Sequence, residues 1–277
     1  MNLIICKDIY ILSFLKWFMK VYSYSKLQTY EQCALKYKFR YIDKIRVEVE
    51  ETIEGFLGKC VHSVLEFLYN ERMQEKGVDI DELIKYYLTV WEKNFSDKFL
   101  IVKSEMKAED YFNKGIKFLT NYYSRNYPFV EKTIATERKI FIELNEKSGL
   151  VGFVDRLAYN EKDDVYEIHD YKTGALKSEK QLEFDRQLAL YSLALKEEFK
   201  DGRDILLIWH YLDHDEKIIL KKTGEQLEVL KKQVLELINE IENAGVFPYT
   251  KSRLCHWCEF KGICPAWQMQ TSLFDFR

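Results

Sequence analysis

The stretch Gly152–Gly174, GFVDRLAYNEKDDVYEIHDYKTG, decides which fold this sequence can adopt. Residues Leu150–Tyr159 are mostly apolar, and the segment that follows, Asn160–Asp164, is wholly polar. The chain then returns to a segment rich in β-branched and aromatic residues, Val165–Tyr171. Two such segments on either side of a short polar turn predict a β-hairpin.

Two acidic residues and one lysine stand in an ordered pattern on this hairpin. Side chains alternate between the two faces of a strand, so Asp170 and Lys172 project from one face, and the hairpin can bring Asp155 beside them. Two carboxylates offer the hard oxygen ligands that Mg²⁺ or Mn²⁺ prefers, and a lysine can orient a water molecule or offset developing charge. The pattern favours metal-dependent phosphodiester hydrolysis. An exposed hairpin with ordinary surface charges is the alternative, because short patterns match often by chance.

Further motifs occur before and after the hairpin. In chain order they are Gly58-x-x-x-His62-x-x-x-Glu66, Gly152-x-x-Asp155-Arg156, Asp170-Tyr171-Lys172-Thr173-Gly174 and Gln187-x-x-x-Tyr191. In this order and spacing the sequence resembles the RecB-like branch of the PD-(D/E)XK nuclease superfamily, over nearly the whole chain from Val21 to Trp267. The resemblance implies an α/β restriction-endonuclease-like core: a mixed central sheet flanked by helices, with a helical insertion and a C-terminal iron–sulfur segment.

The resemblance also implies a set of metal ligands. Asp155 and Asp170 would bind Mg²⁺ or Mn²⁺, His62 would join them, and the backbone carbonyl of Tyr171 would be a further ligand. Glu66 shares a helix face with His62 and would contact the metal through water or orient that histidine. On its own, such a histidine is more often a structural residue than a ligand.

The remaining motif residues would act on the water and the substrate. By resemblance, Lys172 would position the attacking water, while Gln187 and Tyr191 would hold that lysine and orient the substrate backbone. Without the preceding motif, Gln187 and Tyr191 would be an ordinary polar pair on a surface helix. The resulting expectation is a cytoplasmic deoxyribonuclease that acts as an exonuclease on single-stranded DNA ends, in CRISPR spacer processing or in DNA recombination and repair.

A second signal lies near the C-terminus, in the motif Cys255-x-x-Cys258-x-x-x-x-x-Cys264-Pro265. Three cysteines at this density indicate a metal centre, for which Cys33 would be the fourth ligand. One distant cysteine combined with this motif resembles the iron–sulfur staple of AddB and of CRISPR-associated RecB-like nucleases, which implies a 4Fe–4S cluster. Zinc is the main alternative, because Cys₄ zinc sites are common and the spacing alone does not separate the two.

Charge limits where nucleic acid could bind. The net charge of the 277-residue chain is −3, so a nucleic-acid site must be a local patch. Lys36, Lys38 and Arg40 lie beside Cys33 in a segment with few acidic residues. They are either a solvated helix face or a phosphate-contacting patch.

The expected organisation is an N-terminal extension over 1–20, a single RecB-like nuclease domain over 21–277, a helical insertion over 79–127 and a cysteine cluster segment over 250–267. The apolar stretch Leu3–Phe18 is too short and too charged for a convincing membrane span. Met19 is an alternative start of the chain.

Periodicity and turn signals predict the other elements. They are a helix running into an extended piece over Tyr24–Ile45, helices over Phe56–Gln74, Asp79–Phe95, Lys107–Tyr127, Glu179–Phe199 and Gly224–Asn243, and strands over Thr133–Leu144, Ile205–Leu212 and Lys217–Lys222.

Two other functional classes stay open. The chain could be a catalytically silent DNA-binding subunit of a helicase–nuclease complex, or an iron–sulfur redox protein. It contains no G-x-x-x-x-G-K-S/T phosphate loop, so we expect any ATP-driven unwinding to come from a partner such as a helicase, and a CRISPR integration complex is another candidate partner.

Overall fold

The computed structural model describes residues 19–47 and 51–271. The expected N-terminal extension over 1–20 therefore lies outside the described residues, except for Met19 and Lys20. Lys20 already belongs to the first strand of the sheet, so the folded core includes the last residue assigned to that extension.

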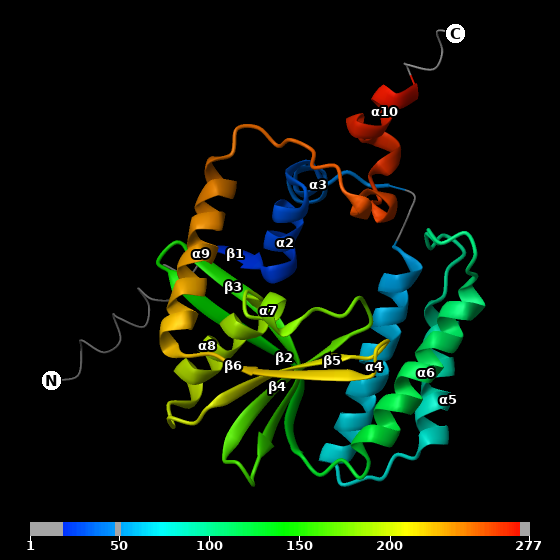
Figure 1. The fold of residues 1–277 in the computed structure, drawn as a ribbon, viewed down its shortest axis with the longest axis vertical. Coiled ribbons are helices and arrows are strands. Elements are labelled where there is room, and N and C mark those ends of the chain that lie inside the picture. Colours follow the sequence, from blue (N-terminus) through cyan, green and yellow to red (C-terminus); the bar gives the residue numbers. More distant parts are fainter. Residues whose placement is uncertain (1–18, 48–50, 272–277) are drawn as a thin grey trace, which may run out of the picture.

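Six strands in the described part of the chain form one mixed sheet (Figure 1). They are β1 (Lys20–Ser23), β2 (Lys132–Asn145), β3 (Ser148–Asn160), β4 (Val165–Lys172), β5 (Ile205–Tyr211) and β6 (Glu216–Lys221). The order is β1-β3-β4-β5-β6, with β2 paired to β3. The β1–β3 and β4–β5 pairs are parallel and the other pairs are antiparallel. The hairpin predicted around Asn160–Asp164 is thus present as β3 and β4.

The edge of β3 that faces β4 has a gap in its pairing. Strand β2 pairs with β3 along nearly its whole length and occupies one edge. On the other edge, β1 pairs with residues 148–151 and β4 pairs with residues 156–160. Residues Gly152–Asp155 lie between these two ladders, so the sheet opens where the G-x-x-D motif stands.

Helices cover both faces of this sheet (Figure 1). They are α2 (Tyr24–Gln32), α3 (Ala34–Tyr37), α4 (Ile53–Met73), α5 (Ile80–Asn94), α6 (Ala108–Asn126), α7 (Glu179–Leu182), α8 (Gln187–Phe199), α9 (Gly224–Asn243) and α10 (Pro265–Thr271). A π-helical turn, η2 (Lys38–Ile42), and two 3₁₀ turns, η3 (Arg253–Trp257) and η4 (Lys261–Ile263), complete the described elements.

The apolar side chains gather in two cores. Helices α4, α5 and α6 enclose one of them, and the predicted apolar stripe of α4, from Leu57 to Leu68, is buried there. Helices α2, α8 and α9 enclose the other core against the sheet. Because the two groups of helices lie on opposite sides of the sheet (Figure 1), the strand ends carrying the motif residues are held between them.

The single helix predicted over Glu179–Phe199 is wrong, because the chain breaks between α7 and α8. The side chain of Asp185 accepts a hydrogen bond from the amide of Gln187, the first residue of α8, at 3.0 Å. Its other oxygen pairs with Lys177 Nζ at 3.0 Å. A buried carboxylate thus satisfies a free amide at the start of α8 and fixes the position of Gln187.

The prediction for Tyr24–Ile45 also needs correction. The helix breaks at Cys33, which has extended backbone angles (φ −165°, ψ 111°), and the expected extended piece begins instead with the π-helical turn η2. Cys33 itself and Leu35, which follows it, bind the C-terminal segment. The amide of Leu35 donates to Pro248 O at 3.1 Å, and the amide of Thr250 donates to Cys33 Sγ at 3.5 Å. These hydrogen bonds with distant residues therefore stabilise the chain where the helix is interrupted at Cys33.

Gly152 stands where no larger residue fits. A Cβ atom at this position would lie 2.3 Å from the ring and hydroxyl of Tyr191 on α8. Helix α8 consequently packs directly on the gap in the sheet, and the glycine of the G-x-x-D motif is explained by the tyrosine of the Q-x-x-x-Y motif.

Gly152→Ala should destabilise the fold by about 1–3 kcal/mol, because the added methyl group forces the Tyr191 ring to move. Chemical denaturation measures the loss. Gly174→Ala is the matched control, since nothing lies within 4 Å of a Cβ atom there. Combining Gly152→Ala with Tyr191→Leu should recover part of the lost stability. Equal stabilities of Gly152→Ala and Gly174→Ala would contradict this explanation.

Candidate functional site

The hairpin places Asp155 beside Asp170. The last pair of the β3–β4 ladder is Arg156 with His169, and the two aspartates follow directly at its end. The backbone amide of Tyr171 donates a 2.8 Å hydrogen bond to Asp155 Oδ2. The side chain of Asp155 is 13% exposed and that of Asp170 is 3% exposed, so both carboxylates lie in a largely dry environment.

His62 on α4 faces the same strand ends. Its Nε2 lies 2.7 Å from the carbonyl oxygen of Tyr171, which can only accept, so this nitrogen carries a hydrogen. Its Nδ1 lies 3.4 Å from Asp155 Oδ2. When the imidazole is neutral and the Asp155 carboxyl is ionised, Nδ1 and Oδ2 are both hydrogen-bond acceptors and face each other without a proton between them. A proton or a cation between Nδ1 and Oδ2 is therefore favourable.

Glu137 on β2 is a site residue that the sequence analysis did not predict. The register pairs Thr136 with Arg156 and Arg138 with Val154, which puts Glu137 opposite Asp155. One donor atom from each of His62, Glu137 and Asp155 lies within 4.8 Å of the others. A lone glutamate in a strand carries no motif, so only the β2–β3 register could have revealed it.

The electrostatics of this group favour a divalent cation. Burial, then the nearby Asp170 carboxylate, raises the pKa of Asp155 to about 6. Burial and the charge of Asp155 raise the pKa of Glu137 as well. A cation would neutralise this crowded negative charge, and carboxylate oxygens with one imidazole nitrogen form a donor set suited to Mn²⁺ and tolerated by Mg²⁺.

Lys172 is held by Asp170 at the end of β4. Its Nζ lies 2.9 Å from Oδ1 and 2.7 Å from Oδ2 of that carboxylate, and 3.3 Å from Gln187 Oε1. Burial alone would lower the pKa of Lys172, but the Asp170 charge outweighs it and raises the pKa. Lys172 is therefore a fixed ammonium group, which donates hydrogen bonds rather than accepting a proton.

The other predicted residues take different positions. Tyr191 is buried against Gly152, and burial raises its pKa to about 12. The Tyr171 hydroxyl points away from the carboxylates into the α4–α6 core, where it lies 3.2 Å from the Tyr122 hydroxyl. Glu66 lines an open groove along α4 that also contains His62 and Glu137. Thus Glu66 lies beside the candidate metal group without belonging to the three-residue set.

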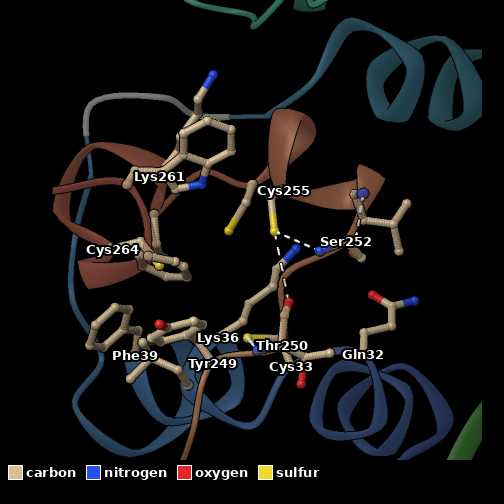
Figure 2. A pocket seen from close by; sticks show the side chains of 16 residues that line it. Gln32, Cys33, Lys36, Phe39, Tyr249, Thr250, Ser252, Cys255, Lys261 and Cys264 are labelled. Atoms are coloured by element: carbon tan, nitrogen blue, oxygen red, sulfur yellow. Dashed lines mark hydrogen bonds between the residues drawn. The ribbon is translucent and has the colours of Figure 1, made fainter. Parts of the chain in front are cut away.

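The four predicted cluster cysteines line one pocket, shown in Figure 2, between the segment around Cys33 and the C-terminal segment. They are Cys33, Cys255, Cys258 and Cys264, all partly buried and none in a disulfide. Figure 2 shows Lys36 extending into the same space. In the described part of the chain, no three of these sulfurs lie within 4.8 Å of one another. Sulfurs around a tetrahedral zinc ion would lie about 3.8 Å apart, given Zn–S bonds of ~2.3 Å.

The predicted basic patch is occupied by ion pairs. Lys36 Nζ lies 3.3 Å from Glu259, and Arg40 binds the same carboxylate through its guanidinium group. Lys38 pairs with Asp43. These three basic side chains share two carboxylates of their own chain, so two of the three positive charges are balanced locally.

A mixed six-stranded sheet with helices on both faces and carboxylates at an opening between strands defines an α/β fold of the restriction-endonuclease-like class. The chain belongs to the PD-(D/E)XK nuclease superfamily, whose sequence model matches residues 21–265. The family resemblance predicted from the motifs is thereby confirmed, and the predicted fold class is confirmed with it.

One bacterial protein is similar in sequence to part of this chain. A component of the ATP-dependent helicase/deoxyribonuclease from Carboxydothermus hydrogenoformans is 27% identical over 188 residues, which cover 57% of this chain and 16% of that protein. This chain therefore corresponds to only a small part of that relative's length.

Two solved structures are also similar. One is described as an exonuclease from Eubacterium rectale (12% identity, TM-score 0.48, covering 89% of this chain and 86% of that chain). The other is SSO0001 (16% identity, TM-score 0.35, covering 74% and 97%). Both TM-scores are below 0.5, so the family assignment rests on the sequence model.

None of the helices within residues 19–47 and 51–271 combines the length and the apolar character needed to cross a membrane.

Asp155→Asn should make the metal-free protein at least as stable as the wild type at pH 7.5. The carboxyl has a pKa of about 6 in the fold against 3.8 ordinarily, so its ionisation destabilises the fold increasingly from about pH 4 to pH 6 and fully above that. The amide keeps an oxygen for the Tyr171 amide and gives His62 Nδ1 a donor. We expect a melting temperature higher by about 2–8 °C at pH 7.5, and no gain at pH 4.

Thermal melts with and without Mg²⁺ check this expectation. Mg²⁺ should stabilise the wild type and leave Asp155→Asn unchanged, because the ligand is lost. Asp163→Asn in the exposed hairpin turn is the control and should behave like the wild type. A metal-free Asp155→Asn protein that melts well below the wild type at pH 7.5 would contradict the electrostatic argument.

Proposed function

We propose that this protein is a divalent-metal-dependent DNA nuclease that acts as an exonuclease on single-stranded ends. The observation that carries the proposal is the convergence of His62, Glu137 and Asp155 beside the Asp170–Lys172 pair, at the opening in the sheet. Five polar groups from three strands and one helix meet where a phosphate could enter from the groove along α4.

The proposed metal ligands are Asp155, Asp170 and His62, with Glu137 added and the Tyr171 carbonyl as a further donor. Bound Mg²⁺ or Mn²⁺ would act as a Lewis acid toward the phosphate and supply an acidified water. The buried carboxylates fix the donor oxygens before substrate arrives, and the Tyr171 amide holds Asp155 in place. Glu66 would reach the site through water from its position in the groove.

Lys172 would orient the attacking water and stabilise negative charge on the phosphate. Its pairing with Asp170 raises the pKa of Lys172, which favours the ammonium form and a role as a hydrogen-bond donor. Gln187 holds its Nζ from the second side. The burial of Tyr191 against Gly152 favours a supporting role, in which it fixes the backbone next to Asp155 rather than contacting substrate.

The choice of DNA and of a helicase as partner is supported by the partial relative, which is named as part of a helicase/deoxyribonuclease. We propose that the chain trims DNA ends in recombination or repair, or in CRISPR spacer processing. A helicase or a CRISPR integration complex would be the partner, and the cytoplasm the compartment.

We further propose that Cys33, Cys255, Cys258 and Cys264 hold a 4Fe–4S cluster. The support is that all four cysteines line one pocket and that none of them is in a disulfide. Four thiolates are the usual ligands of such a cluster. It would join residue 33 to the C-terminal segment and so constrain a very long loop, which is a structural role.

The two alternative functions, a silent DNA-binding subunit and an iron–sulfur redox protein, predict different experimental results. A silent DNA-binding subunit would bind DNA without metal-dependent cleavage, and a redox protein would show reversible cluster reduction without cleavage. An assay of single-stranded DNA cleavage with Mg²⁺, Mn²⁺, Ca²⁺ or excess chelator separates them. We expect activity with the first two ions and little with Ca²⁺, whose longer bonds and looser geometry suit this chemistry poorly.

Asp170→Asn and Lys172→Met should each reduce cleavage at least about a hundredfold, because each removes a group that stabilises transition-state charge. Initial rates on a labelled single-stranded oligonucleotide measure the loss. Lys162→Met is the control, since this lysine is exposed in the hairpin turn and has no ion pair within the described part of the chain. Wild-type rates for Lys172→Met would remove this residue from the mechanism.

Cys255→Ser should give a protein without iron and with a lower melting temperature, while any soluble fraction keeps metal-dependent cleavage. The physical reason is the loss of a link between residue 33 and the C-terminal segment, which restricts the unfolded chain. For a disulfide that closes so long a loop, the entropy relation gives about 4–5 kcal/mol of stability; for the cluster we expect a stability change in the same direction. Iron and zinc analysis, visible absorbance and thermal melts on one anaerobic preparation measure the result.

Cys60→Ala is the matched control for the cysteine substitution, because Cys60 is buried in the α4–α6 core and does not line the cysteine pocket. It should keep the wild-type iron content. Zinc without iron in the wild-type protein would overturn the cluster and leave the structural link in place.

A further inference from the structure

The basic residues of the C-terminal cysteine segment differ from those of α3 and η2. Lys251, Arg253 and Lys261 are exposed, and none of them has an acidic partner within 4.0 Å among residues 19–47 and 51–271. Lys36 and Arg40, by contrast, share the carboxylate of Glu259. Lys36 and Arg40 share one carboxylate and so keep one excess positive charge, whereas the C-terminal segment contributes three basic groups without an acidic partner, so most of the uncompensated positive charge near the cysteine pocket lies on that segment.

Two of these three basic groups are held in place by one aromatic ring. Lys251 Nζ lies 5.1 Å and Lys261 Nζ lies 4.7 Å from the centre of the Trp267 ring. The His256 ring packs edge-on against the same indole, with 5.4 Å between centres. Ammonium groups positioned in this way lose less freedom when they bind an anion than lysines extended into solvent.

A surface hollow lies next to this tryptophan. Leu100, His256, Glu259, Lys261 and Trp267 are among its lining residues. Glu259 is the one acidic group among its described lining residues, and its charge is balanced by Lys36 and Arg40. The hollow thus combines aromatic surface with net positive charge, the two features that single-stranded nucleic acid recognition uses.

The hollow lies beside the start of α4, the helix that carries His62. Leu100 pairs with Thr52 at the N-terminus of α4, and Trp257 Nε1 donates to Glu54 Oε1 at 3.3 Å. The groove along α4 contains Glu54 and continues to His62. Nine residues separate Ile53 from His62, which is roughly 14 Å along a helix.

We propose that Lys251, Arg253 and Lys261, with Trp267 between the two lysines, form a binding surface for the phosphate backbone of single-stranded DNA, distal to the metal centre. The proposal rests on the proposed DNA substrate and extends it. A strand seated here and running along α4 would cover the roughly 14 Å from Ile53 to His62 in addition to the part that lies on the binding surface, so a very short strand could not contact both.

The test measures DNA binding separately from cleavage. The triple variant Lys251→Gln/Arg253→Gln/Lys261→Gln and the wild type are titrated with a fluorescent 20-nucleotide single strand in excess chelator, at several salt concentrations. We expect at least tenfold weaker binding at low salt. The slope of log affinity against log salt should fall by about two, because each lost phosphate contact contributes ~0.7 for a single strand.

A matched triple variant, Lys147→Gln/Lys162→Gln/Lys200→Gln, removes the same charge from three other exposed lysines that have no ion pair within the described part of the chain. It should bind like the wild type. Equal losses in both triple variants would show a general charge effect and overturn the proposal. An unchanged single-strand affinity in the first triple variant, or a loss confined to blunt duplex DNA, would overturn it too.

Substrate length gives an independent readout. With Mg²⁺, the first triple variant should cleave a 20-nucleotide strand with a raised KM and a wild-type kcat, and a 3-nucleotide strand like the wild type. Iron content and melting temperature must match the wild type, and single Lys251→Gln and Arg253→Gln variants replace the triple variant if they do not. If the wild type binds DNA through this surface but cleaves nothing, the proposed nuclease activity fails while the binding surface stands.

Discussion

The opening in β3 at Gly152–Asp155 is the constraint on which the rest of the structure depends. Because β1 and β4 each cover only part of one edge of β3, the strand is free at the position where a metal site needs room. Helix α8 packs its Tyr191 ring onto Gly152 from one side, and α4 brings His62 from the other. The site is thus built from a break in regular pairing that two helices hold open.

Stability and reactivity oppose each other in this opening. Ionised carboxylates that are buried and close together destabilise the metal-free fold. The raised pKa of Asp155 is consistent with this, because it means that the folded protein disfavours the ionised form. The same closeness would favour a divalent cation. On the opposite face of the hairpin, the buried Arg156 stacks 4.1 Å from the Tyr69 ring and lies 2.7 Å from His169 Nε2. Arg156 thus links β3 to His169 on β4 and to Tyr69 on α4 through buried polar contacts.

The two ends of the chain are joined away from this site. Contacts of Leu35 with Pro248 and of Cys33 with Thr250 bring the segment after α2 against the segment after α9. Trp257, between two of the cysteines, donates to Glu54 in the first turn of α4. The cysteine segment is therefore mechanically connected to the helix that carries His62, which gives a physical route by which loss of the cysteine centre would disturb the groove.

The sequence by itself determined the hairpin, most of the longer helices and strands, and the approach of Asp155 to Asp170 and Lys172, because these depend on side-chain alternation and on residues close in the chain. Only the tertiary structure decided the role of Glu137, the break before Gln187, and the pairing of Lys36 and Arg40 with Glu259. Each of these depends on strand register or on contacts between residues far apart in sequence. Such contacts follow from packing, which local patterns do not contain.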